Sequence, residues 1–273
     1  MMLIAGLVAS LPAARPGAAQ EIEKAGNRVL PNRTDSEDAD LQDQIKAAAV
    51  AARDHMEQAL ESDVVYVRSD ALREARILDE SWIAELALPR CESPDLTERS
   101  IALEVVSSSD PSMGREAFLE ALESDERNIR LRGLLGLEQL ADEGTVNEVV
   151  EILRNDPDPD VREVAARTLG AIGSDLAHDA LIEALDSDHP ALREQAVLSL
   201  VAIGDSELGE LLLERLDANE FPGEVNLLRM LALIPDPALV PRIKPFVHHS
   251  SEEVETSAAA AILTILERSG YTY

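Results

Sequence analysis

Residues 159–173 read PDVREVAARTLGAIG, and residues 190–204 read PALREQAVLSLVAIG. Both stretches place proline first, arginine fourth, alanine seventh, leucine eleventh and glycine last. Proline suits the first turn of a helix, and glycine suits the residue that ends one. The two stretches start 31 residues apart, and self-similarity at a fixed spacing of this size indicates a stack of repeated helical units.

The same period extends through most of the chain. Five arginines recur at gaps of 31, 31, 32 and 31 residues, namely Arg68, Arg99, Arg130, Arg162 and Arg193. A second series of apolar residues keeps the same register, namely Leu122, Leu153, Leu185, Leu216 and Val247. The one additional residue falls within or beside 155–160. We expect a loop there, because an insertion within a helix would turn its apolar face away from the core.

The pattern predicts an all-α solenoid of about six helix-pair repeats, followed by a half-repeat that ends near Arg268. Each repeat has a first helix, a short turn and a second helix. The boundaries are 63–93, 94–124, 125–155, 156–187, 188–218 and 219–249. Hydrophobic residues make up 45% of the chain and aromatic residues only 3%, a balance that suits close-packed helices better than a sheet sandwich.

Shorter segments flank the repeats. Residues 1–19 resemble an export signal, with an apolar run too short to span a membrane and small residues before Gln20. No basic residue precedes that run, so either the true start lies upstream or the signal is atypical. Residues 20–40 are interpreted as a disordered acidic linker, 41–62 as an N-terminal capping helix and 269–273 as a tail.

The string at 159–173 resembles the HEAT repeat family, in particular its short phycobilisome-lyase-type repeats. The resemblance covers about 63–268. It implies a right-handed superhelix with first helices on the convex face and second helices on the concave face. It also implies that the recurring arginines form a structural ladder between repeats.

We expect each ladder arginine to bridge to an acid or a carbonyl of the adjoining repeat. Asp160 is a candidate partner for Arg162 within its own repeat. Glu224 and Glu255 occupy the arginine positions of the last two first helices, so these helices must stack through a different polar contact.

Acidic residues recur on the second helices, at positions that point away from the apolar stripe. They are Glu116, Glu120, Glu151, Asp179, Glu183, Glu210 and Glu214. Pro241 and Pro245 occupy the same positions in the next repeat, beside Arg242 and Lys244. Two interpretations stay open. The acids form either an ordinary solvated helix face or an acidic concave surface that binds a basic partner.

The formal net charge is −29, which argues against nucleic acid and against an anionic membrane surface as partners. A charged partner should therefore be basic. The same composition is also typical of adaptation to a salty environment, so the charge by itself does not establish a binding function.

No catalytic, cofactor-binding or metal-binding set emerges from the residues. Asp156, Asp158 and Asp160 begin like a calcium loop, but Arg167 stands where such a loop needs a bidentate glutamate. HEAT-like hydroxylases bind iron through His-Glu pairs, and the sequence has no His-Glu dipeptide. His248 and His249 lack a matching histidine pair elsewhere. The single cysteine, Cys91, falls in an apolar position and is interpreted as a buried filler.

The sequence therefore predicts a non-enzymatic protein-interaction scaffold, exported to the periplasm or secreted, with no cofactor and no membrane insertion of the mature chain. A HEAT-like lyase or hydroxylase and a purely structural spacer are the alternatives. Residues 251–266 form a first helix with no second helix behind it, and its apolar side chains are Val254, Ala258, Ile262 and Ile265. Either the chain end or a second copy could cover them, so a homodimer through this half-repeat is a further expectation.

Overall fold

The computed structural model describes residues 35–76 and 81–271, and within them every regular element is helical. The chain divides into two units, Met1–His55 and Met56–Tyr273. The predicted export signal and most of the predicted linker lie outside the described residues. None of the described helices combines the length and apolar character that a membrane span requires.

The first described helix is α2 (Asp35–Leu60). It begins six residues earlier than the predicted capping helix, within the segment predicted as a linker. An acidic run is compatible with the first turns of a helix, because the helix N-terminus carries partial positive charge. In the last turn of α2, Leu60 is buried, and Met56 and Ala59 pack against the core of the repeats.

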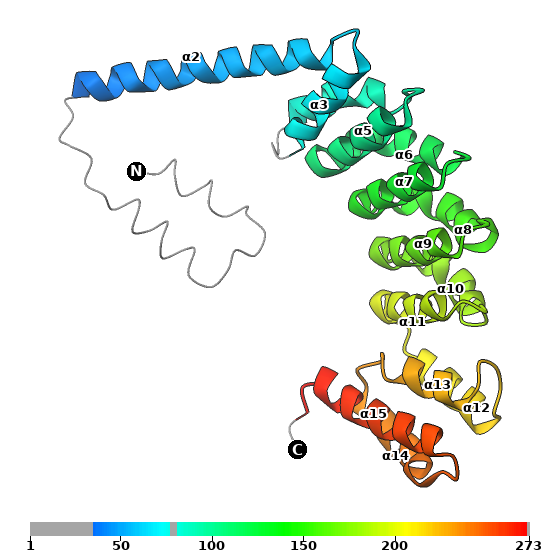
Figure 1. Cartoon of the computed structure of the whole chain (residues 1–273). Coiled ribbons are helices and arrows are strands. Elements are labelled where there is room, and N and C mark those ends of the chain that lie inside the picture. The colour runs from blue at the N-terminus through cyan, green and yellow to red at the C-terminus, as the bar shows by residue number, and fades with distance from the viewer. Residues whose placement is uncertain (1–34, 77–80, 272–273) are drawn as a thin grey trace. The chain divides into compact units, whose positions relative to one another are not determined.

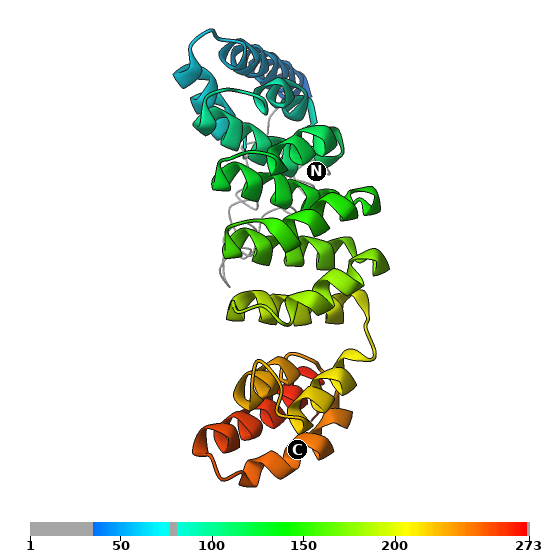
Figure 2. The same cartoon turned by 90° about the vertical axis from the view of Figure 1, so that its right-hand side faces the viewer.

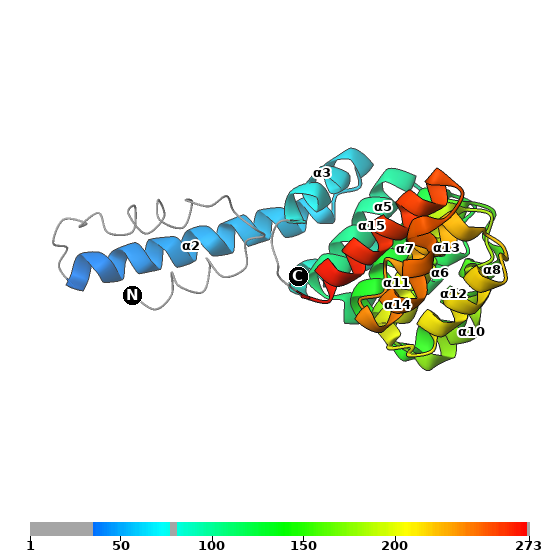
Figure 3. The ribbon, with the colours of Figure 1, turned by 90° about the horizontal axis from the view of Figure 1, so that it is seen from below.

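The repeats alternate first and second helices. The first helices are α3 (Val65–Ala75), α5 (Leu96–Ser109), α7 (Arg127–Leu140), α9 (Pro159–Ile172), α11 (Pro190–Ile203), α13 (Glu224–Leu231) and α15 (Glu252–Arg268). The second helices are α4 (Ser81–Ala87), α6 (Arg115–Leu122), α8 (Val146–Asn155), α10 (His178–Ala184), α12 (Leu208–Asp217) and α14 (Val240–Ile243). Figures 1 and 3 show α8, α10 and α12 on one side of α9, α11 and α13. The predicted all-α solenoid is confirmed.

Local signals fix where the first helices begin and end. The side chain of Asp158 accepts hydrogen bonds from the backbone N–H groups of Asp160 and Val161, and Pro159 follows it at the first helical position. Gly173 and Gly204 end α9 and α11 with φ of +73° and +86°, a left-handed conformation that glycine adopts without steric cost. These punctuation residues explain why the sequence located the helices well.

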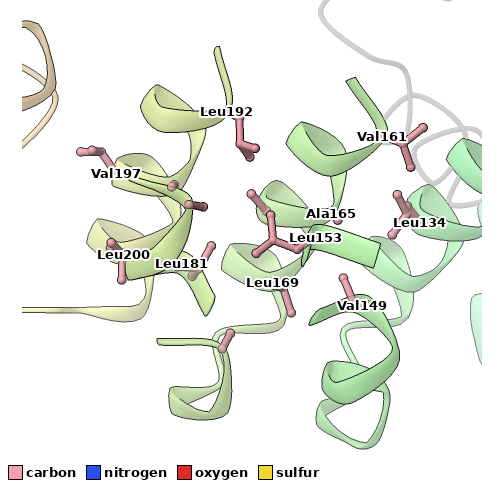
Figure 4. Close-up of a cluster of buried hydrophobic side chains, with 14 of the residues drawn as sticks. Leu134, Val149, Leu153, Val161, Ala165, Leu169, Leu181, Leu192, Val197 and Leu200 are labelled. Atoms are coloured by element: carbon pink, nitrogen blue, oxygen red, sulfur yellow. The ribbon is translucent and has the colours of Figure 1, made fainter. Parts of the chain in front are cut away.

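The core is a continuous column of aliphatic side chains (Figure 4). Leu169 of α9 is fully buried, and so are Leu134 of α7 and Leu200 of α11 on either side of that helix. Ala165 and Ala196 are fully buried in the predicted small-residue position, and Gly133 holds that position in α7. A Cβ on Gly133 would lie 2.7 Å from the carbonyl oxygen of Phe118, so this repeat tolerates no side chain there.

The last full repeat departs from the pattern. Its second helix is a single turn, α14, followed by a 3-10 segment over Lys244–His248 that contains Val247. Pro245 accounts for the change, because proline lacks the N–H that an α-helix requires. Figure 2 shows α14 and α15 (orange to red) packed together at the C-terminal end.

The apolar face of the C-terminal half-repeat is largely covered by the chain itself. Val254, Ala258 and Ile265 of α15 are buried, and Ile262 is half-buried. The large hydrophobic side chains that stay exposed among the described residues of this end are Leu263 and Tyr271. The exposed apolar face on which the expected homodimer rested is therefore mostly absent.

Candidate functional site

The seven predicted acids lie on four successive second helices, and all seven are exposed. We call them the acidic second-helix face. The acids occupy two positions that lie one turn apart, and α6, α10 and α12 contribute from both while α8 contributes from one. The members are Glu116 and Glu120 on α6, Glu151 on α8, Asp179 and Glu183 on α10, and Glu210 and Glu214 on α12. Whether this face is concave stays a prediction.

Three of these acids form ion pairs with arginines of the chain. Glu183 accepts hydrogen bonds from Nε and Nη2 of Arg154, which belongs to the preceding repeat, at 2.8 and 3.0 Å. Glu210 lies 3.3 Å from Nη1 of Arg242 in the following repeat. Glu120 lies 3.6 Å from Nη2 of Arg99. Glu183 and Glu210 therefore link adjacent repeats.

The other four acids have no arginine or lysine nitrogen within 4 Å among the described residues. Glu151 accepts a hydrogen bond from Nδ2 of Asn155 at 2.9 Å, and Asp179 lies 3.4 Å from Nδ1 of His178. Glu116 and Glu214 make no side-chain hydrogen bond or ion pair with any described residue. Each of α6, α8, α10 and α12 therefore presents one carboxylate that has no arginine or lysine nitrogen within 4 Å among the described residues.

The acidic face ends at α14. Arg242 donates Nη2 to Asp217 at 2.5 Å as well as contacting Glu210, and Lys244 is exposed beside it. The hydrogen bond to Asp217 raises the pKa of Arg242. A basic boundary at this point limits the acidic second-helix face to α6, α8, α10 and α12.

Three of the five ladder arginines share one contact. Nη1 of the arginine donates to the carbonyl oxygen of the residue six positions earlier, in the loop before its own helix. The three pairs are Arg68 with Ser62 at 2.7 Å, Arg130 with Ser124 at 3.0 Å, and Arg193 with Ser187 at 2.7 Å. This contact ties the start of a first helix to the end of the preceding repeat.

Two ladder arginines also form an ion pair with a carboxylate of the following repeat. Arg68 pairs with the fully buried Glu98 through Nε and Nη2, at 2.5 and 2.9 Å. The hydrogen bond from Arg68 is the main cause that lowers the pKa of Glu98, with a further hydrogen bond from Ser93. Arg130 pairs with Asp156 in the same bidentate way, at 2.6 and 2.9 Å. Sequence reasoning missed both acids, because each belongs to a different position of the repeat.

The remaining ladder arginines differ. Arg99 contacts Glu120, and Arg193 lies 5.7 Å from the centre of the Phe221 ring. Arg162 forms no ion pair with a described residue. Asp160, its predicted partner, instead accepts a hydrogen bond from Nη2 of Arg127 at 2.6 Å, because it lies on the side of α9 that faces α7.

The arginine position changes sign near the C-terminus. Glu224 occupies it in α13 and lies 3.7 Å from Nε2 of His249. His249 stands six residues before Glu255, which is the loop position that Asp156 holds relative to Arg162. Compared with the pair of Arg130 and Asp156, the acidic residue therefore lies on the first helix and the basic residue lies in the loop of the following repeat. This is the different polar contact that the sequence predicted for α13.

Comparison with known proteins assigns the architecture. A family model described as HEAT repeats matches residues 146–223. The chain is a HEAT-like repeat protein. No curated protein matches it.

Solved structures share the architecture of this HEAT-like repeat protein at low sequence identity. The complex of CpcE and CpcF of phycocyanin lyase from Nostoc sp. PCC7120 is similar with a TM-score of 0.50 and 17% identity, over 77% of this chain and 93% of that chain. An engineered protein gives 0.49 and 19%, over 77% and 67%. A designed armadillo repeat protein in complex with the peptide (KR)4 gives 0.47 and 13%, over 77% and 98%. At this identity the likeness extends to the fold alone.

The aspartates and the cysteine that the sequence analysis considered as possible functional residues make structural contacts instead. Asp156 pairs with Arg130, while Asp158 and Asp160 pair with Arg127, so the calcium-like run serves as ladder and helix cap. Cys91 is buried as predicted, and burial raises the pKa of its thiol to about 12. In the described part of the chain, no three His, Cys, Asp or Glu side chains gather as a metal site would require.

Proposed function

We propose that this HEAT-like repeat protein is a non-enzymatic protein-interaction scaffold, and that its acidic second-helix face binds a basic segment of a partner protein. One observation carries the proposal. Each of four successive second helices keeps one exposed carboxylate without an arginine or lysine partner, namely Glu116, Glu151, Asp179 and Glu214.

The spacing of the helices suggests what would fit. Neighbouring packed helices lie roughly 8–10 Å apart, and an extended chain advances about 3.3 Å per residue. A segment that crosses the stack would therefore meet a new carboxylate about every third residue. Lysine or arginine at such a spacing would be complementary to the four free acids.

The proposal also includes export of the mature chain to the cell envelope or beyond. It rests on the composition of residues 1–19 and on the excess of acids. Mass spectrometry of the protein recovered from its natural cells tests it. A mature chain that starts near Gln20 is expected, and a full-length chain in the cytoplasm would contradict export.

The test of the acidic face compares two quadruple variants of equal net charge. The first carries Glu116→Gln, Glu151→Gln, Asp179→Asn and Glu214→Gln. The control carries Glu→Gln at four exposed acids in or beside first helices, Glu74, Glu126, Glu194 and Glu253. Partners are recovered from envelope extract with the unaltered chain, and the affinity of each purified partner is then measured for all three proteins.

We expect at least a tenfold loss of affinity in the first variant and less than a twofold change in the control. The loss should shrink as salt rises, because salt screens exposed charges. Equal affinities in the two variants would disprove the acidic-face proposal. Recovery of no specific partner would favour the structural spacer. Light scattering of the free chain tests the homodimer, and a monomer at high concentration would dismiss it.

A further inference from the structure

Arg99 and Arg162 each have a buried Nε without a partner, but Glu120 lies 3.6 Å from Nη2 of Arg99. Arg162 is therefore the ladder arginine that makes no side-chain hydrogen bond or ion pair with a described residue. Its Nε is buried and has no hydrogen-bond partner among the described residues. It also lacks the ion pair that Arg68 forms with Glu98 and that Arg130 forms with Asp156. A buried donor without a partner loses its hydration without replacement, which is unfavourable.

The following repeat explains why Arg162 has no carboxylate. Asp156, the partner of Arg130, accepts the backbone N–H of Asp158 at 2.9 Å. Ser187 makes the same loop contact one repeat later, with the N–H of His189 at 3.1 Å. Serine thus stands where the acid would have to stand. The other acid position, held by Glu98 immediately before Arg99, holds Leu192 immediately before Arg193.

A cavity of about 360 Å³ lies beside Arg162. Leu153, Ala184 and Leu192 supply apolar wall, and Ser187 and Asp188 lie in the loop before α11. This size is at the lower end of ligand-binding pockets. A partner side chain could therefore enter between α8 and α10 and reach the guanidinium.

The charges around the cavity do not exclude an anion. Glu183 is held by Arg154, and Asp186 accepts Nη1 of Arg215 at 2.5 Å. Asp188 is exposed and lies more than 4 Å from every nitrogen of Arg162. Two of the three acids are thus paired with arginines other than Arg162, and Asp188 is not within ion-pair distance of Arg162.

We propose that this cavity binds the carboxylate of an aspartate or glutamate side chain from a partner protein. The carboxylate would lie against Arg162 as Asp156 lies against Arg130, since the guanidinium fork accepts a carboxylate through two parallel hydrogen bonds. This site is separate from the acidic second-helix face. It stands on a different observation, so it survives if that face binds nothing.

The experiment follows the Nε–Hε resonance of Arg162 by NMR in the full chain. The probe is a capped Gly-Glu-Gly peptide, titrated at constant ionic strength against capped Gly-Gln-Gly, and sodium acetate is titrated separately against sodium chloride. The Arg162→Gln variant assigns the resonance. The Nε–Hε of Arg130 is the internal reference, because it already donates a hydrogen bond to Asp156.

We expect the glutamate peptide to shift the Arg162 resonance saturably and to leave Arg130 unchanged. Ser187→Asp should weaken this binding at least tenfold, because the new carboxylate takes the place of the ligand. Should Ser187→Asp fail to fold, loss of the peptide-induced shifts at the Ser187 and Leu192 amides in Arg162→Gln supports the site equally. The proposal would be overturned if the glutamate peptide shifted the resonance no more than the glutamine peptide does. It would also be overturned if acetate bound and the glutamate peptide did not. A resonance that responds to Asp188→Asn but not to the peptide would show that Asp188 occupies Arg162.

Discussion

Arg130 and Asp156 form a bidentate ion pair across two repeats, with their side chains only 9% and 1% exposed. Asp156 also caps its own loop through the N–H of Asp158, and Arg130 holds the carbonyl of Ser124. One pair of side chains therefore joins the ends of three consecutive repeats. Its removal should affect the stack more than removal of any exposed pair.

We predict that Asp156→Asn destabilises the repeats by about 3 kcal/mol or more, because a buried arginine loses its counter-charge. Urea unfolding followed by circular dichroism measures the effect. Glu183→Gln is the matched control, since it breaks a bidentate pair with Arg154 that is exposed, and it should cost less than about 1 kcal/mol. Equal losses in the two variants would show that burial does not decide the strength of these pairs.

A second prediction concerns pH and His178. Burial alone would lower the pKa of this imidazole, but hydrogen bonds to Asp179 and Asp205 and the charges of both acids outweigh burial and raise it above 6.5. A raised pKa in the folded state means that the contact stabilises the protein fully below pH 6.5. The contribution is lost as pH rises through the folded-state pKa.

NMR titration of the His178 ring and urea unfolding at pH 5.5 and pH 9 test this. The His178→Gln variant should lose stability relative to the unaltered chain at pH 5.5, and the difference should shrink at pH 9. Arg115 makes the equivalent contact with Asp142 two repeats earlier, at 2.7 Å, and Arg115→Gln should cost the same at both pH values. A pH-independent effect of His178→Gln would refute the prediction.

The third prediction separates two glycines of α7 that both lie close to Phe118. A Cβ on Gly136 would lie 2.3–2.5 Å from the Phe118 ring, whereas a Cβ on Gly133 would meet the Phe118 carbonyl oxygen at 2.7 Å. Each Gly→Ala change should destabilise the protein by about 1–3 kcal/mol through overpacking. Only the Gly136→Ala variant should be partly rescued by Phe118→Leu, because a smaller side chain does not move a backbone oxygen. Rescue of both variants, measured by thermal unfolding, would contradict this.

The ends of the first helices were the part of the fold that the sequence predicted best. Pro159, Gly173 and Gly204 predicted helix ends that the structure places at the expected residues, because caps depend on a few neighbouring backbone groups. The small-residue position at Ala165 and Ala196 was also recognisable. The sequence did not show that Gly133 admits not even a methyl group, since that restriction comes from the carbonyl of Phe118 on another helix.

The acidic second-helix face shows the limit for function. Its seven residues and their exposure followed from helical periodicity, which depends only on position along the chain. Which acids are free did not follow. Arg154 reaches Glu183 across 29 residues, and Arg242 reaches Glu210 across 32, and no single fixed spacing would have identified both.

The sequence by itself determined the repeat period, the ends of the first helices that carry proline and glycine, and the buried positions, because these depend on local hydrogen bonding and on a regular apolar stripe. Only the tertiary structure decided how the charges pair, since an ion pair requires two side chains from different repeats to come within 4 Å. That distance depends on how closely each repeat packs on the next. The packing of the repeats brings Arg130 next to Asp156 and Glu224 next to His249, and it leaves Arg162 without an ion pair among the described residues.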